Sequence, residues 1–121
     1  MSRNFKKTVA IDFDGVIHSY VSGWKGHDVI PDPPVPGAFT AMQNYIRNHF
    51  DIVIYSTRAE CQKGIDAIYE WLTEHGFNQQ DKIKIQATKP PASIYIDDRG
   101  FCFKGEFPAP EFINNFKPWK T

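Results

Sequence analysis

The stretch Val9-Ala10-Ile11-Asp12-Phe13-Asp14-Gly15-Val16 joins a short apolar run to two acidic residues and a glycine. The apolar run is typical of a buried strand, and an Asp-Gly pair is typical of the turn that ends one. In open α/β sheets, ligands bind in the crevice beyond the carboxyl ends of the strands. The stretch therefore puts Asp12 and Asp14 where a ligand would bind, and a plain turn with a solvated Asp12 is the simpler alternative.

The composition fits one modest domain over residues 1–121. The 14 basic and 14 acidic residues give a formal net charge of zero, which does not indicate a membrane-binding patch or a nucleic-acid coat. A local basic groove would still be compatible with that total. Cys61 and Cys102 lack metal-ligand spacing, so we expect reduced, buried thiols of a cytoplasmic protein.

The apolar pattern predicts alternating strands and helices downstream of this stretch. The expected strands cover 8–12, 51–56, 82–86 and 93–96, with a further short one at 101–103. The expected helices begin at Pro36-Gly37, extend over about 60–75, and end the chain at 110–116. The residues expected on their buried faces are Phe39, Met42, Tyr45 and Ile46; Cys61, Ile65, Ile68, Tyr69 and Leu72; and Phe112, Ile113 and Phe116. This order predicts an α/β fold with a doubly wound, Rossmann-like parallel sheet and helices on both faces.

Residues 16–36 fit neither a helix nor a central strand, because they are rich in glycine, proline and aromatic residues. We interpret them as a flap, with 16–30 forming a short hairpin near the mouth of the site. His18, Trp24 and His27 either contact substrate there or pack in the core or on the surface, and packing is the simpler interpretation for each.

Three of the expected strands end in polar residues: Asp12 and Asp14, Ser56 and Arg58, and Asp97 and Asp98. Because parallel strands end along one edge of a sheet, these side chains are expected to meet. Four carboxylates in one crevice would repel one another by several kcal/mol at about 4 Å. An all-oxygen ligand set of this kind suits Mg²⁺.

The order Asp12-Phe13-Asp14-Gly15, Ser56, Lys89 and Asp97-Asp98 resembles the haloacid dehalogenase-like phosphatase superfamily. The match spans most of the chain. The endings Ser-Thr-Arg and Ile-Asp-Asp-Arg are also similar to the 3′-phosphatase domain of phage polynucleotide kinase and to the deoxyribonucleotidases, although this likeness is weaker. A receiver domain gathers similar residues in a different order, with the lysine last, which disfavours that alternative.

The resemblance implies a Mg²⁺-dependent phosphatase that hydrolyses phosphomonoesters through an aspartyl-phosphate. Asp12 would be the nucleophile and Asp14 the acid and base, while Ser56 and Lys89 would contact the phosphoryl group. The implied metal ligands are Asp12, Asp14 through its carbonyl, Asp97 and Asp98, the last either directly or through the shell around the ion.

Several of these residues keep a simpler interpretation. Lys89 could be a solvated linker residue, and Asp98 could cap a turn or pair with Arg99. Ser56 and Thr57 both compete for the phosphate, since Thr57 could instead cap a helix. Arg58 could bind phosphate or face solvent. The candidate substrate-binding residues are therefore Ser56, Thr57, Arg58 and Lys89.

The flap at 16–36 leaves no room for the cap domain that many members of the superfamily carry. The resemblance therefore implies an open site for a small or macromolecular phosphorylated substrate, a nucleic-acid end included, or a site that a neighbouring subunit covers. No membrane partner is expected. Two alternatives to a phosphatase stay open: a non-catalytic module that binds phosphoryl ligands or a protein, and a phosphotransferase.

Overall fold

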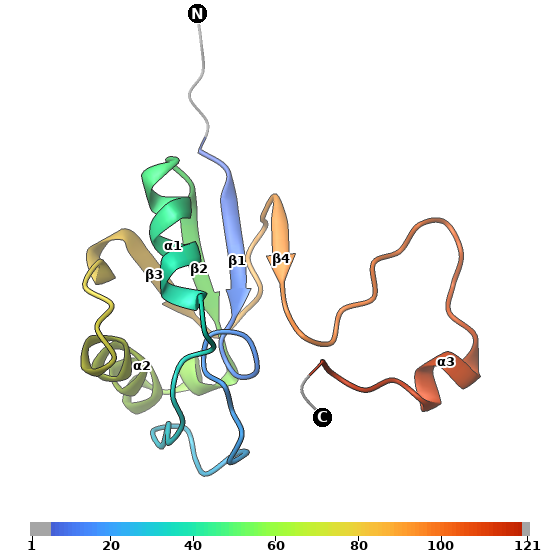
Figure 1. Cartoon of the computed structure of the whole chain (residues 1–121), viewed down its shortest axis with the longest axis horizontal. Helices are drawn as coiled ribbons and strands as arrows, with labels where there is room; N and C mark the ends of the chain where they lie inside the picture. The colour runs from blue at the N-terminus through green and yellow to red at the C-terminus, as the bar shows by residue number, and fades with distance from the viewer. Residues whose placement is uncertain (1–5, 120–121) are drawn as a thin grey trace, which may run out of the picture.

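The computed structural model describes residues 6–119, and its centre is a sheet of four parallel strands in the order β3-β2-β1-β4 (Figure 1). The strands are β1 (Thr8–Asp12), β2 (Asp51–Tyr55), β3 (Ile83–Gln86) and β4 (Ile94–Ile96). The helices are α1 (Ala38–Arg47), α2 (Gln62–Glu74) and α3 (Pro110–Asn114), with 3-10 turns η1 (Thr57–Glu60) and η2 (Gln80–Lys82). Residues 1–5 and 120–121 of the expected domain lie outside the described residues.

The register of the sheet brings the strand ends together. Asp12 pairs with Tyr55 of β2, Tyr55 pairs with Gln86 of β3, and Ile11 pairs with Ile96 of β4. Because all four strands are parallel, the polar residues that follow β1, β2 and β4 lie along one edge. The predicted α/β class and parallel sheet are confirmed.

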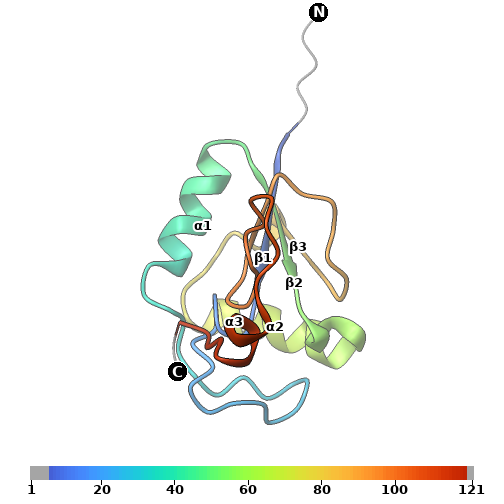
Figure 2. The ribbon, with the colours of Figure 1, turned by 90° about the vertical axis from the view of Figure 1, so that its right-hand side faces the viewer.

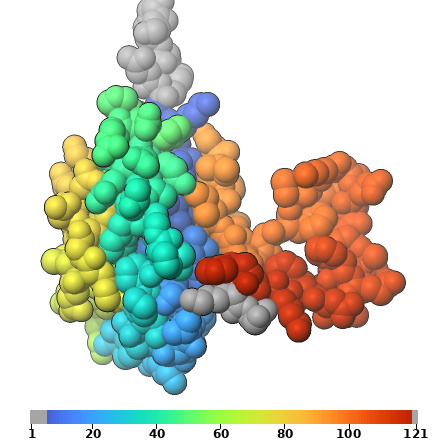
Figure 3. Space-filling view, viewed as in Figure 1, coloured from blue at the N-terminus to red at the C-terminus, as the bar shows by residue number. Residues whose placement is uncertain are grey.

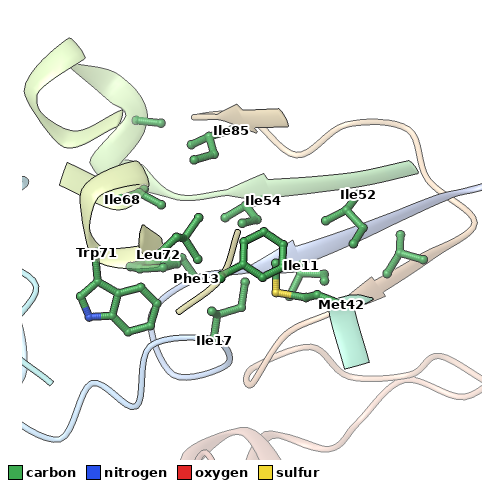
Figure 4. Packing of buried hydrophobic residues seen from close by; sticks show 13 residues of the cluster. Ile11, Phe13, Ile17, Met42, Ile52, Ile54, Ile68, Trp71, Leu72 and Ile85 are labelled. Carbon is green, nitrogen blue, oxygen red and sulfur yellow. The ribbon is translucent and has the colours of Figure 1, made fainter. Parts of the chain in front are cut away.

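One face of the sheet forms the core together with both long helices. Ile11, Ile54 and Ile85 share a register row and join Met42 of α1 and Leu72 of α2 in one buried cluster (Figure 4). Two crossovers that run in the same direction with right-handed connections place their helices on the same side of a sheet. The expected amphipathic stripes therefore pack where such connections put them.

The opposite face carries a different row, with Ala10, Val53 and Tyr95 in register. The connection 87–93 from β3 to β4 passes on this side, away from α1 (Figure 2). It contains Pro90 and Pro91, and it is too short to form a helix of its own. The doubly wound arrangement with helices on both faces is therefore not confirmed within residues 6–119.

Helix α2 begins at Gln62, two residues later than expected. Cys61 precedes its first turn with extended backbone, so the thiol is exposed instead of lying on the buried face. Cys102 is exposed as well, and the prediction of buried thiols is wrong for both cysteines. Trp71, which was not among the residues expected on the buried face of this helix, is buried next to Leu72. Among residues 6–119, no helix is long and apolar enough to cross a bilayer.

The flap at 16–36 forms a closed loop without regular strands, so the expected hairpin is absent from it. Its base is tied by Ser19 N–H donating to the Pro33 carbonyl at 2.9 Å and Val35 N–H donating to the Ile17 carbonyl at 2.8 Å. The Asp32 carboxylate accepts from the main-chain N–H and the hydroxyl of Ser22. These bonds hold the two ends of the flap together, and Trp71 Nε1 of α2 donates to the Asp32 carbonyl at 2.9 Å, which ties the flap to the helix.

Residues 99–119, which we call the arm, leave the sheet after β4 and project from the body (residues 6–98) (Figures 1 and 3). The expected strand at 101–103 does not form, and the final helix is only Pro110–Asn114. Phe112, Ile113 and Phe116 are exposed, so the prediction that they face inward is wrong. The arm crosses no sheet face that could bury them.

Candidate active site

Asp12 is the last residue of β1, and its half-buried carboxylate accepts from the N–H of Phe13 at 2.8 Å. Burial raises its pKa from 3.8 to about 7, the bond from Phe13 lowers it, and the negative charges of Asp98, Asp14 and Asp97 raise it further. The four acids therefore influence one another at the strand ends, as expected from the sequence.

Ser56 follows β2 and is buried, and its hydroxyl accepts from the N–H of Arg58 at 3.1 Å. Ser56 is thus the cap of η1, while Thr57 is the first residue of that turn and is exposed. The alternative in which Thr57 caps the helix is wrong. Both residues line one pocket of about 380 Å³ together with Asp12 and Asp14.

Arg58 is fully buried, so the alternative in which it faces solvent is wrong. Its Nε donates to both carboxylate oxygens of Asp14, at 3.2 and 3.0 Å. One terminal nitrogen donates to the carbonyls of Gly26, His27 and Val29, at 2.6, 3.0 and 3.1 Å. Arg58 therefore joins Asp14 to the flap, a role that the sequence did not suggest.

The main chain at Arg58 is held closely by α2. A Cβ atom at Gly64 would collide with the Arg58 carbonyl group, so the helix meets η1 where only glycine fits. This contact fixes the direction in which the Arg58 side chain leaves the backbone.

His18 forms the second support of Asp14. Its Nδ1 lies 2.8 Å from Asp14 Oδ1, and its Nε2 accepts from the N–H of Asp32 at 3.2 Å. An Nε2 that accepts places the ring proton on Nδ1, which then donates to Asp14. His18 is fully buried and stacks on Phe13, so the packing interpretation of this histidine is confirmed.

Asp97 and Asp98 follow β4 and are half-buried. Asp97 Oδ1 accepts from the N–H groups of Arg99, at 3.0 Å, and Gly100, which makes Asp97 the residue that caps this turn. Asp98 packs against Gly15, where a Cβ atom would collide with its carboxylate. Gly15 has φ +87°, a conformation that glycine adopts without strain.

Lys89 extends from the connection 87–93 to the same edge of the sheet. Its Nζ lies 4.8 Å from the ring centre of Tyr95 and 5.7 Å from that of Tyr55. It lines a second pocket of about 300 Å³ with Asp12, Tyr55 and Asp97. Lys89 thus lies beside Asp12 and Asp97, where the resemblance puts it, and its side chain is exposed.

The hydroxyl of Tyr55 is buried between these groups without a hydrogen-bond partner among residues 6–119. Burial, followed by the charges of Asp12 and Asp97, raises its pKa, so this phenol keeps its proton and stays a donor. A buried donor without an acceptor costs free energy, which a bound oxygen ligand would recover. Nothing in the sequence pointed to Tyr55 beyond its place at the end of the second strand.

No group of three or more His, Cys, Asp or Glu side chains within residues 6–119 is arranged to hold a metal. Two of the acids already form other hydrogen bonds. The Asp14 carboxylate accepts from Arg58 and His18, and the Asp97 carboxylate accepts from main-chain N–H groups. A separate apolar groove of about 220 Å³ between α1 and β4 contains no acid or hydroxyl of the site.

Comparison with known proteins gave no relative: no family model, no curated protein and no solved structure matches this chain.

Proposed function

We propose that this protein is a Mg²⁺-dependent phosphatase of the haloacid dehalogenase-like type that hydrolyses phosphomonoesters through an aspartyl-phosphate. The observation that carries the proposal is one pocket lined by Asp12, Asp14 and Ser56, with Lys89 beside Asp12 in the adjoining pocket. A nucleophile, an acid, a hydroxyl donor and a cation around one space of this size suit a phosphoryl group.

Mg²⁺ fits the donor set, because burial and the charges of Asp98, Asp14 and Asp97 disfavour the ionised Asp12 carboxylate, and a bound cation would stabilise that ionised form. Mg²⁺ usually takes only one or two carboxylates from a protein and fills its other positions with water and phosphate oxygens. Asp12, the main-chain carbonyl of Asp14 and one of Asp97 and Asp98 would hold it. When bound, the ion neutralises phosphoryl charge during transfer.

In the first step, a carboxylate oxygen of Asp12 bonds to phosphorus as the bond from phosphorus to the leaving oxygen breaks, and Asp14, which enters this step protonated, gives that oxygen its proton. In the second step, Asp14 takes a proton from water. The water oxygen bonds to phosphorus, and the bond to Asp12 breaks to release phosphate. Arg58 and His18 support both steps by holding the Asp14 carboxylate in one orientation.

Three further groups would bind the phosphoryl oxygens. The Ser56 hydroxyl accepts from Arg58 N–H and so keeps its own proton free to donate. Lys89 offsets negative charge beside Asp12, and the buried Tyr55 hydroxyl supplies a donor that lacks an acceptor. Thr57 lines the pocket of about 380 Å³ together with Ser56.

The test compares Asp12→Asn with Asp81→Asn, a matched change at an exposed acid of η2. Phosphate release would be measured on aryl phosphate and nucleotides, with Mg²⁺ and with a chelator. Wild type and Asp81→Asn are expected to release phosphate only with Mg²⁺. Asp12→Asn is expected to lose at least about a thousand-fold in rate, because a missing nucleophile stops the first step.

Activity of Asp12→Asn within ten-fold of wild type, roughly the loss of one hydrogen bond, would contradict the assigned nucleophile. A new phosphoester formed with added alcohols would instead identify a phosphotransferase. Phosphoryl-ligand binding without turnover by folded wild type would identify a non-catalytic module.

The setting belongs to the same proposal. Two exposed, unpaired cysteines suit a reducing cytoplasmic compartment. The flap leaves the pocket without a cap domain, so either a large phosphorylated substrate or a second subunit has room to approach it.

A further inference from the structure

An aromatic wall faces the acids across the pocket of about 380 Å³. Tyr20 and Trp24, both from the flap, line this pocket together with Asp12 and Ser56. Phosphoryl transfer itself needs neither aromatic ring. A pocket of this volume has room for more than a phosphoryl group, so the wall borders the space left for the rest of the substrate.

Trp24 is held in place by Arg58 and His27. The guanidinium of Arg58 lies 4.7 Å from its ring centre, and the ring of His27 meets it edge-on at 5.1 Å. Arg58 Nη2 has no hydrogen-bond partner among residues 6–119, so its contact with the indole ring takes that place. Yet Trp24 stays 45% exposed, which leaves an oriented aromatic surface open to the pocket.

Tyr20 is held with comparable rigidity. Its ring meets the buried His18 ring edge-on at 5.8 Å. Its φ of 62° lies in the left-handed region, which is uncommon for a bulky residue and is retained only when the surroundings enforce it. The position of this ring at the pocket wall therefore requires a strained backbone conformation at Tyr20.

The geometry points to a subsite for a planar aromatic ring in the leaving group, that is, to nucleoside phosphates as the substrate class. A nucleobase stacks on an aromatic side chain whatever its sequence identity, because every base has a π-face. The rings of Tyr20 and Trp24 provide stacking surfaces, and Tyr20 adds a single phenol hydroxyl. Such a wall would distinguish a substrate with a base from one without, and it would bind all four bases. This inference rests on the proposed function, since it assigns the leaving group of that reaction.

Two sources carry the same chemistry: a free mononucleotide, and the terminal nucleotide of a strand. Assays with 5′- and 3′-mononucleotides and with a 3′-phosphorylated oligonucleotide separate them, and the lowest KM identifies the source. Ribose 5-phosphate, which keeps the phosphate and the sugar and lacks the base, serves as the matched control substrate.

The decisive variants are Trp24→Leu, which removes the ring, and Trp24→Phe, which keeps one. We expect Trp24→Leu to raise KM for nucleotides about ten-fold and to leave KM for ribose 5-phosphate unchanged. Trp24→Phe is expected to stay near wild type, which separates ring stacking from a loss of flap structure. Equal effects on both substrates, or a wild-type KM for ribose 5-phosphate equal to that for nucleotides, would overturn the subsite.

Binding to the Asp12→Asn variant keeps this inference separable from the proposed function. Calorimetric titration is expected to show a nucleoside monophosphate binding about ten-fold more tightly than ribose 5-phosphate, and this preference is expected to vanish when Trp24→Leu is added. If wild type hydrolyses no substrate but nucleoside monophosphate still binds more tightly than ribose 5-phosphate, the subsite is supported and the proposed hydrolysis is contradicted. If nucleotides are hydrolysed without any effect of Trp24, hydrolysis stands and the subsite falls.

Discussion

Leu72 and Ile113 are both aliphatic residues of helices, yet Leu72 in the body is fully buried while Ile113 in the arm is 61% exposed. The difference lies in what each helix crosses. Helix α2 has three turns and follows a strand, so its connection returns it to the sheet. Helix α3 has only five residues, lies after the last strand and buries none of its side chains.

The arm therefore shows that apolar content alone does not make a core. Its rings contact one another locally, as Phe101 does with Phe112 at 5.4 Å, without excluding water. The arm returns to the body near its end, where Trp119 Nε1 donates to the Gly15 carbonyl at 2.9 Å. Apolar side chains of this kind form a core only where their helix or strand packs against another element.

The largest effect expected from this comparison is in the body. Leu72→Ala should lower the free energy of unfolding by about 3 kcal/mol, because it removes buried methyl groups and leaves a cavity beside Ile54 and Ile68 (Figure 4). Chemical denaturation would measure the change, with the dependence of the free energy of unfolding on denaturant concentration expected to stay the same. A loss below about 1 kcal/mol would mean that the body is packed no better than the arm.

An intermediate effect is expected at the acids, where a carboxylate is held in a partly buried position. The Asp12 carboxyl has a pKa of about 7 when folded and near 3.8 when unfolded, so the folded state binds more protons between these values. Stability should therefore fall as pH rises from about 4 to 7. In chelator, Asp12→Asn should raise the melting temperature by several degrees at pH 8 and have little effect at pH 4.

The same scan with Asp81→Asn provides the control for that pH effect. Asp81 is exposed on η2, so its substitution should leave the pH dependence of the melting temperature unchanged. An equal gain at pH 4 and pH 8 for Asp12→Asn would show that charge is not the cause.

The smallest effect is expected in the arm, from the substitution matched to Leu72→Ala. Ile113→Ala removes an exposed side chain from a helix, where alanine is also the better helix former, so the free energy of unfolding should change by less than about 0.5 kcal/mol. The same denaturation measurement would detect a larger loss. A loss above 1 kcal/mol would show that the arm is covered in solution, as a second subunit would cover it.

Periodicity and strand-end chemistry predicted the body well. The apolar runs at Val9–Ile11 and Ile52–Ile54 are typical of central strands of a parallel sheet, and the alternation with α1 and α2 then places their carboxyl ends together. Asp12 and Ser56 were placed at the site by that reasoning, because a strand end is a local property, whereas Lys89 was identified through the resemblance.

The rest depended on contacts between distant residues. Arg58 meets Asp14 and the carbonyls of the flap across many residues of chain, and no local pattern distinguishes such an arginine from a solvated one. Likewise, the apolar spacing of Phe112 and Phe116 fits an inward helix. Whether a sheet face is available there depends on how the chain leaves β4.

Gly64 has a consequence for recognising distant relatives of this chain. Any protein that keeps the buried arginine and the contact of α2 with η1 must also keep a residue without a side chain six positions later. The combination Ser-Thr-Arg, five residues of any kind, then Gly is therefore a search pattern with a steric reason behind it. Sequences that share it should share the Arg58 geometry even where overall similarity has faded.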